Sequence, residues 1–139
     1  MRVRPPCQGS PPRASAPLKI YFDGGCRPNP GAIEVAVVVA GTVHVRRDLG
    51  QGSSADAEWL ALIHAVGIAQ LQGLTDFVLL GDAKGVVGQA SSKARCRGAA
   101  IGHHARLMAM LAPGQALRIR YIKRTQNLAG IALARLHDR

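Results

Sequence analysis

Hydrophobic and polar residues alternate in three consecutive segments near the start of the chain, a pattern that predicts β-strands. The first covers residues 18–23 and contains aromatic and branched side chains, the second covers 33–40, and the third covers 43–47 with a polar face. The first strand is expected to end at Asp23, because two glycines and a Pro-Asn-Pro-Gly turn follow it. The short connections between the three strands predict an antiparallel meander.

The hydrophobic period changes after Asp56 and predicts a helix over residues 57–71. Glu58 is expected in the first turn of this helix, and residues 50–54 are expected to form a loop before it. Trp59 belongs to the apolar row of the helix, which favours a place in the core over stacking on a nucleic-acid base.

A continuous apolar run over residues 77–81 predicts a strand that is buried on both faces and ends at Asp82. Because a strand, a helix and a second strand form a crossover, this strand is expected to run parallel to the first. The remaining pattern predicts helices over 84–89, 100–111 and 128–136 and a strand over 117–122. The buried side of the helix over 100–111 is expected to consist of Ile101, Leu107, Met108 and Leu111. The chain is therefore expected to form an α/β fold with a five-stranded mixed sheet flanked by helices.

The length and composition of the chain predict one folded domain with an N-terminal tail. A chain of 139 residues is long enough to bury one core. Residues 1–17 contain five of the eight prolines and several arginines but no acidic residue, which is typical of a disordered basic tail. An organelle transit peptide is an alternative, although the prolines disfavour an amphipathic helix. The folded domain is expected to cover residues 18–139.

The net charge of +10 indicates a polyanionic partner, with nucleic acid ahead of an acidic membrane surface, although a merely basic soluble protein is the alternative. No apolar run approaches the roughly 18 residues that span a bilayer. Cys7, Cys26 and Cys96 form neither a CxxC pair nor a disulfide framework, which favours a reducing compartment. We therefore expect a cytoplasmic monomer without membrane contact.

Three of the few acidic residues are expected to converge. Asp23 and Asp82 end two parallel strands, and Glu58 lies on the helix that connects those strands. Sites in open α/β sheets lie outside the carboxyl ends of such strands. An acidic cluster on a basic chain would repel nucleic acid unless divalent cations neutralise it, and Mg²⁺ prefers carboxylate oxygens. Two such ions could activate water and stabilise the leaving oxygen of a phosphodiester. The alternative for Asp23 alone is a residue that caps a turn.

Four short segments, in their order and spacing, resemble type 1 ribonuclease H. They are residues 22–31 (FDGGCRPNPG), 57–62 (AEWLAL), 81–87 (GDAKGVV) and 124–135 (RTQNLAGIALAR). The resemblance covers about residues 18–136, nearly all of the expected domain. It implies a ribonuclease H-like five-stranded mixed sheet flanked by helices. It also implies endonucleolytic hydrolysis of the RNA strand of an RNA–DNA hybrid with Mg²⁺ or Mn²⁺.

The resemblance also assigns roles to residues by position. Asp23, Glu58 and Asp82 would be the catalytic metal ligands for two ions, with Asp23 bridging both. The residues implied to bind the hybrid are Gly24, Gly25, Cys26, Arg27, Asn29, Ser54, Lys84, Arg124 and Asn127.

The chain departs from the family pattern near the expected site. Ile131 stands four residues after Asn127, where the family has a fourth carboxylate, so the second ion is expected to bind more weakly. Ser54 and Ala55 replace an asparagine pair, and Ala83 replaces a serine. The alternative function is therefore a ribonuclease H-like binding module with little or no turnover. Asn127 could offer an amide oxygen to a metal, but a helix cap is the simpler role.

Other features leave two interpretations open. The His103-His104 pair is expected on the solvated surface rather than at a metal. Cys26 lies in the site loop, where a packing role is preferred to oxidation or binding of a soft metal. Either a phosphate-contacting ridge or a solvated face could be formed by Lys84, Lys93, Arg95 and Arg97. An actin-like nucleotide-binding fold would need a second domain, for which the chain is too short.

Overall fold

The computed structural model describes residues 16–137, so the tail predicted over 1–17 lies outside the described residues except for its last two positions. A mixed sheet crosses the molecule in the strand order β3-β2-β1-β5-β6. The strands are β1 (Leu18–Arg27), β2 (Gly31–Val39), β3 (Thr42–Arg46), β5 (Phe77–Gly81) and β6 (Ile119–Tyr121). The two-residue β4 (Gln51–Gly52) pairs with β2 as a sixth strand.

The directions of the strands agree with the prediction from the sequence. β1, β2 and β3 pair as an antiparallel meander, and β5 lies parallel to both β1 and β6. The predicted mixed sheet is therefore confirmed.

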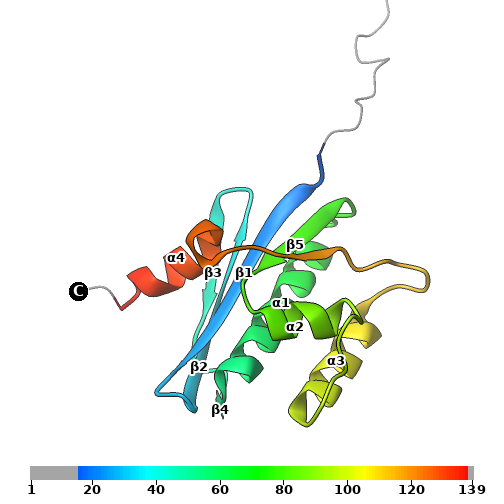
Figure 1. The fold of residues 1–139 in the computed structure, drawn as a ribbon. Helices are drawn as coiled ribbons and strands as arrows, with labels where there is room; N and C mark the ends of the chain where they lie inside the picture. The colour runs from blue at the N-terminus through cyan, green and yellow to red at the C-terminus, as the bar shows by residue number, and fades with distance from the viewer. Residues whose placement is uncertain (1–15, 138–139) are drawn as a thin grey trace, which may run out of the picture.

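Helices cover both faces of this sheet. They are α1 (Ser54–Leu71), α2 (Lys84–Ala90), α3 (Ala99–Met110) and α4 (Leu128–Arg135), and a 3-10 turn (Arg124–Gln126) precedes α4. Figure 1 shows α4 on one side of the sheet and α1, α2 and α3 on the other. None of the helices within residues 16–137 is long and apolar enough to cross a membrane.

Strand alternation divides the buried side chains into two clusters. Ile20 and Phe22 point from β1 into the larger core, where they join Trp59 and Leu62 of α1. The smaller cluster lies under α4 and contains Ala36, Val38, Ala129 and Leu133. Trp59 is only 1% exposed, which confirms its predicted place in the core.

The boundaries of β1 and α1 differ most from the prediction. β1 does not end at Asp23 but continues to Arg27, because its last residues pair with the beginning of β2. α1 begins at Ser54 rather than at residue 57, because the Ser53 hydroxyl accepts a hydrogen bond from the Asp56 amide and the Asp56 carboxylate accepts one from the Ser53 amide. Glu58 consequently lies in the second turn of α1 instead of the first.

The buried side of α3 also differs from the prediction. Leu107 is fully buried, but Ile101 and Met108 are exposed. The side that faces α1 instead carries His103, whose ring stacks on Trp59 at 6.1 Å between centroids. His103 Nε2 also lies 3.0 Å from Asp56 Oδ1. The prediction of a solvated histidine was therefore wrong for His103, because α1 offers both an aromatic surface and a carboxylate.

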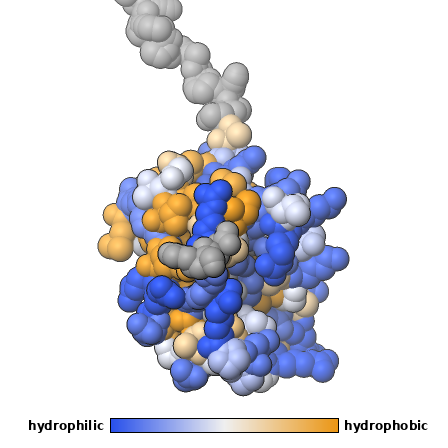
Figure 2. Space-filling model, turned by 90° about the vertical axis from the view of Figure 1, so that its left-hand side faces the viewer, coloured by the Kyte–Doolittle hydropathy of each residue, from blue (hydrophilic) through white to orange (hydrophobic). Residues whose placement is uncertain are grey.

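The side of the molecule on which α4 lies shows both kinds of surface. In Figure 2, hydrophobic residues gather in the upper part of this face, and the lower and right-hand parts are mostly hydrophilic. Exposed apolar residues of the neighbouring elements include Val43 in β3 and Leu128 and Ile131 in α4. The outer side of α4 is thus partly apolar, although its inner side already packs on the sheet.

β1 and α1 approach each other most closely at Gly24. A Cβ atom at this position would lie 2.1 Å from the carbonyl oxygen of Ala57 and 2.9 Å from the amide nitrogen of Glu58. Both of these atoms belong to the backbone of α1, which cannot move aside as a flexible side chain can. Only glycine fits here, and its absent side chain brings α1 against the strand that carries Asp23.

We predict that Gly24→Ala destabilises the fold by at least about 1–3 kcal/mol, because the added methyl group overpacks a backbone contact. The matched control is Gly102→Ala in α3, where a Cβ atom would meet no atom within 4 Å. Alanine favours helix by about 1 kcal/mol over glycine, so the control should be stabilised. Urea denaturation of both variants measures the difference. Equal stability of the two variants would contradict the close approach at Gly24.

Candidate active site

An opening in the sheet lies beside the middle of β1. The last pair between β1 and the parallel strand β5 joins Tyr21 to Leu80, whereas β1 continues past Asp23. The chain leaves β5 at Gly81, so Asp82 follows directly where the neighbouring strand stops. Because no strand among residues 16–137 flanks β1 on this side at Asp23, side chains from both faces of the sheet can meet there.

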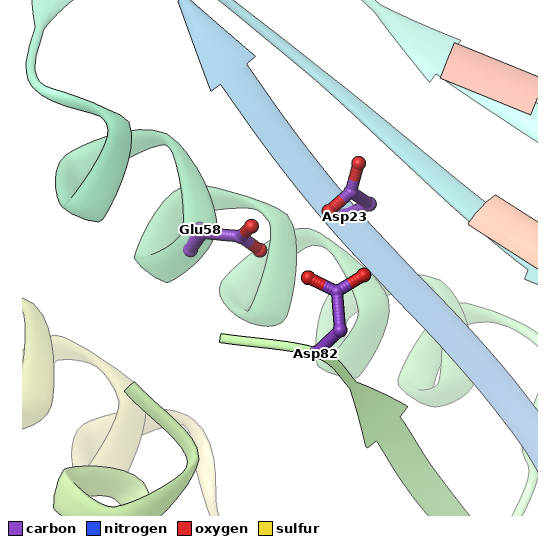
Figure 3. A group of neighbouring side chains, drawn as sticks. All are labelled: Asp23, Glu58 and Asp82. Atoms are coloured by element: carbon purple, nitrogen blue, oxygen red, sulfur yellow. The ribbon is translucent and has the colours of Figure 1, made fainter. Parts of the chain in front are cut away.

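Three carboxylates meet at this opening. Asp23, Glu58 and Asp82 each offer an oxygen atom, and these atoms lie within 4.8 Å of one another. Figure 3 shows the three side chains pointing toward a common centre from β1, from α1 and from the end of β5. Asp23 and Glu58 are almost completely buried, and the side chain of Asp82 is only 4% exposed. The acids that the sequence singled out thus lie together.

Backbone and side-chain groups hold two of these carboxylates in place. The Gly24 amide donates a hydrogen bond of 3.3 Å to Glu58 Oε1. The guanidinium of Arg124, which is largely exposed, lies 3.7 Å from Asp82 Oδ1. Asp82 therefore has a positive charge on its solvent side.

Asn127 has two structural roles at once. Its amide oxygen accepts hydrogen bonds from the backbone of Ala129 and Gly130, which makes it the N-cap of α4. Its amide nitrogen donates to Asp82 Oδ2 and to the carbonyl oxygen of Phe22, both at 3.0 Å. The oxygen is occupied by the cap, so the suggestion that it binds a metal is not supported. The nitrogen instead connects α4 to Asp82.

The electrostatics of the cluster favour retention of protons. Burial raises the pKa of Glu58 to about 10, and the charges of Asp23 and Asp82 add to this shift. Burial also raises the pKa of Asp23 to about 6, although a hydrogen bond from Glu58 opposes the shift. Three negative charges at this spacing are therefore not stable together near neutral pH without a compensating cation.

The residues of the cluster fit a hard divalent cation. Asp23 Oδ1 is buried and has no hydrogen-bond partner among the described residues. An unpartnered buried carboxylate oxygen is costly, and a cation would satisfy it. Mg²⁺ and Mn²⁺ both accept carboxylate oxygens as ligands.

α4 contributes no carboxylate to this cluster. A Cβ atom at Gly130 would lie 3.4 Å from Asp23 Oδ2, so the helix passes close to this group without adding a ligand. Ile131, at the position of the fourth carboxylate in the resembled family, is exposed. α4, the helix on this side of Asp23, therefore supplies no acid of its own to the cluster.

A cleft of about 700 Å³ opens over the three carboxylates. Seven of the residues expected to bind substrate line it: Gly24, Gly25, Cys26, Arg27, Asn29, Ser54 and Arg124. The other two do not. Asn127 is buried behind Asp82, and the Lys84 amino group lies over the Tyr121 ring at 5.2 Å.

The rim of the cleft is connected to α1 by Asn29. Its side-chain oxygen accepts hydrogen bonds from the Ser54 amide at 3.2 Å and from the Cys26 thiol at 3.4 Å. Its side-chain nitrogen lies 3.4 Å from the Ser54 hydroxyl. The turn between β1 and β2 is thereby fixed relative to the start of α1.

Two residues that line the cleft were missed in the sequence. Gln89 accepts a hydrogen bond from the Trp59 indole at 3.2 Å and donates one to the Arg95 carbonyl at 3.3 Å. It lies near the end of α2, and no local pattern in the sequence distinguishes it from any other polar residue of a short helix. The other residue is Glu34, whose place in the middle of an apolar strand indicated only a polar position.

We predict that the metal-free protein loses stability as the pH rises from about 5 to 9. The raised pKa values of Asp23 and Glu58 mean that the folded state binds more protons than the unfolded chain in this range. For each such proton, the free energy of unfolding falls by up to about 1.4 kcal/mol for every unit by which the pH rises. Denaturation in EDTA should show a smaller loss for Glu58→Gln than for the unaltered chain. Identical pH profiles would contradict proton retention in the cluster.

The comparisons with known proteins identify the family. A sequence profile of the reverse transcriptase-like family matches residues 22–137. A search by sequence among curated proteins finds no match. Among solved structures, ribonuclease H1 from the halophilic archaeon Halobacterium salinarum is 26% identical, with a TM-score of 0.74 over 88% of this chain and 98% of that chain.

Two further structures are similar. The N-terminal ribonuclease H domain of a Mycobacterium tuberculosis protein is 25% identical, with a TM-score of 0.67 over 88% of this chain and 99% of that domain chain. LC11-RNase H1, from compost metagenomic material and in complex with an RNA/DNA hybrid, is 26% identical, with a TM-score of 0.68 over 84% of this chain and 92% of its own. The chain therefore belongs to the reverse transcriptase-like family and has the ribonuclease H-like fold.

Proposed function

We propose that the protein is a metal-dependent endoribonuclease that hydrolyses the RNA strand of RNA–DNA hybrids. The observation that carries this proposal is the meeting of Asp23, Glu58 and Asp82 at the floor of a cleft, with one buried oxygen of Asp23 left without a partner. The similarity to LC11-RNase H1, which was solved with an RNA/DNA hybrid, supports this choice of substrate. The net charge of +10 suits a polyanionic substrate.

Asp23, Glu58 and Asp82 would hold two Mg²⁺ or Mn²⁺ ions. When bound, such ions supply an activated water and neutralise charge on the leaving oxygen of the phosphodiester. Glu58 must lose the proton that it holds in the metal-free state, so binding of the ions should release protons. Since Ile131 provides no ligand, we expect weaker binding of the second ion.

The chain's own residues orient the substrate around this centre. Asn127 holds Asp82 in place through its side-chain amide, and the exposed guanidinium of Arg124 stands on the solvent side of Asp82. Arg124 is therefore positioned to attract a backbone phosphate next to the carboxylates. The Ser54 hydroxyl, at the start of α1, could accept a hydrogen bond from a ribose 2′-OH or donate one to it. The 2′-OH group is what distinguishes RNA from DNA at such a contact.

Ile131 favours a second candidate function, a ribonuclease H-like module that binds hybrids with little or no turnover. The retained cluster argues against complete loss of catalysis, because three buried acids destabilise a fold that has no cation to hold. If the unaltered chain binds hybrid without cutting it, Ile131→Asp is the substitution expected to restore cleavage.

We also propose that residues 18–139 form one ribonuclease H-like domain that acts as a cytoplasmic monomer, with the basic segment before it as an added tail. Cys26 and Cys96 are free thiols, which suits a reducing compartment.

We predict that the protein, with Mg²⁺ or Mn²⁺, cleaves only the RNA strand of an end-labelled RNA–DNA hybrid, and that EDTA abolishes the cleavage. Asp82→Asn should lower the rate by at least about 100-fold, because electrostatic groups at a reacting centre commonly contribute that much. The matched control is Asp76→Asn, which removes an exposed aspartate that pairs with Arg118. A fully active Asp82→Asn protein would contradict the assigned site.

A further inference from the structure

Glu34 is an unusual residue for the centre of the sheet. It lies on β2 opposite Gly25 of β1, so it shares a sheet face with Asp23, two residues along the strand. Its side chain is buried, and it lines the same cleft as the three clustered carboxylates. A buried carboxylate needs polar or charged partners, and three side chains contact Glu34.

The partners of Glu34 come from three different segments. Arg27, at the end of β1, places its Nε atom 3.9 Å from Glu34 Oε2, and Arg47, after β3, places its Nε atom 3.4 Å from Oε1. His137, which follows α4, contacts Oε2 through its Nε2 atom. Glu34 thus contacts residues at or just beyond the ends of β1, β3 and α4, at the edge of the cleft.

Both arginines pair with Glu34 through the Nε atom. Neither guanidinium makes a hydrogen bond to any of the residues 16–137, and neither has another ion-pair partner among them. The side chains of Arg27 and Arg47 are 63% and 54% exposed. Two permanent positive charges outweigh the single carboxylate, and each guanidinium presents its outer nitrogens to solvent. This is the geometry that binds a phosphate with two parallel hydrogen bonds.

We infer that Arg27 and Arg47 form a binding site for a backbone phosphate of the nucleic-acid substrate, and that Glu34 with His137 positions the two guanidiniums. This inference rests on the proposed function for the substrate class, and it adds Glu34, Arg47 and His137 to the residues that recognise it.

The position of this site relative to the metal cluster sets its distance along the substrate. Arg27 lies four residues beyond Asp23 on β1, which corresponds to about 13 Å. The phosphate held here would therefore be a different one from the phosphate that reacts. The site would therefore fix the register and orientation of the duplex without reading its sequence.

The test measures hybrid binding over a series of salt concentrations by fluorescence anisotropy, in EDTA so that the hybrid stays intact. Each phosphate contact contributes roughly 0.9 to the slope of log affinity against log salt. Arg27→Gln and Arg47→Gln should each weaken hybrid binding, and the double variant, which loses the phosphate contact, should lower the slope by about one. The matched control is Arg118→Gln, whose arginine pairs with Asp76 beside the opposite end of β5. An unchanged slope in the double variant would overturn the inference.

The variant Glu34→Gln distinguishes a role of Glu34 in positioning the two arginines from a simple effect of its negative charge. The substitution makes the protein more positive, so a diffuse electrostatic surface would bind hybrid more tightly. If Glu34 orients the guanidiniums, the dissociation constant should rise and the slope should fall despite the added charge. Tighter binding of Glu34→Gln would overturn the positioning role, and the exposed arginine variants test the phosphate site even if Glu34→Gln does not fold.

The outcome also separates this inference from the proposed function. Cleavage of hybrid by the unaltered chain, together with an unchanged salt slope in the double variant, would overturn the phosphate site alone. Arginine-dependent hybrid binding by a chain that does not cleave would overturn the proposed hydrolysis alone.

Discussion

The mutual repulsion of three buried carboxylates is the constraint on which the rest of this structure depends. Asp23, Glu58 and Asp82 are held within 4.8 Å of one another, where burial and like charge both disfavour ionisation. A fold that only needed stability would not bring these groups together. The arrangement becomes favourable when a divalent cation supplies the missing positive charge, and Asp23 Oδ1 is the atom left for it.

The backbone around the cluster allows the three carboxylates to come close together. β5 ends beside the middle of β1, which leaves an opening where acids from both faces of the sheet can reach one another. Gly24 lets α1 approach until its Glu58 side chain reaches the strand, and the Gly24 amide then binds that carboxylate. Asn127 completes the arrangement, because one side chain both starts α4 and holds Asp82.

The sequence predicted the mixed sheet and the three acids, because period and chain order determine which strands end together. It did not predict that β1 continues past Asp23, since two glycines resemble a turn until pairing with β2 is known. The sequence also did not predict the buried side of α3. His103 lies on that side because its ring stacks on Trp59 and its Nε2 atom contacts the Asp56 carboxylate. The contacts of Glu34 join residues up to 103 positions apart, and no local pattern encodes such contacts.

We expect the three carboxylates to hold a proton that a divalent cation displaces. Calorimetric titration of the metal-free protein with Mn²⁺ near neutral pH, in buffers of different ionisation enthalpy, tests this expectation most directly. We expect an ion to bind with release of about one proton, because the ligands must be deprotonated. Absence of binding, or binding without proton release, would contradict it.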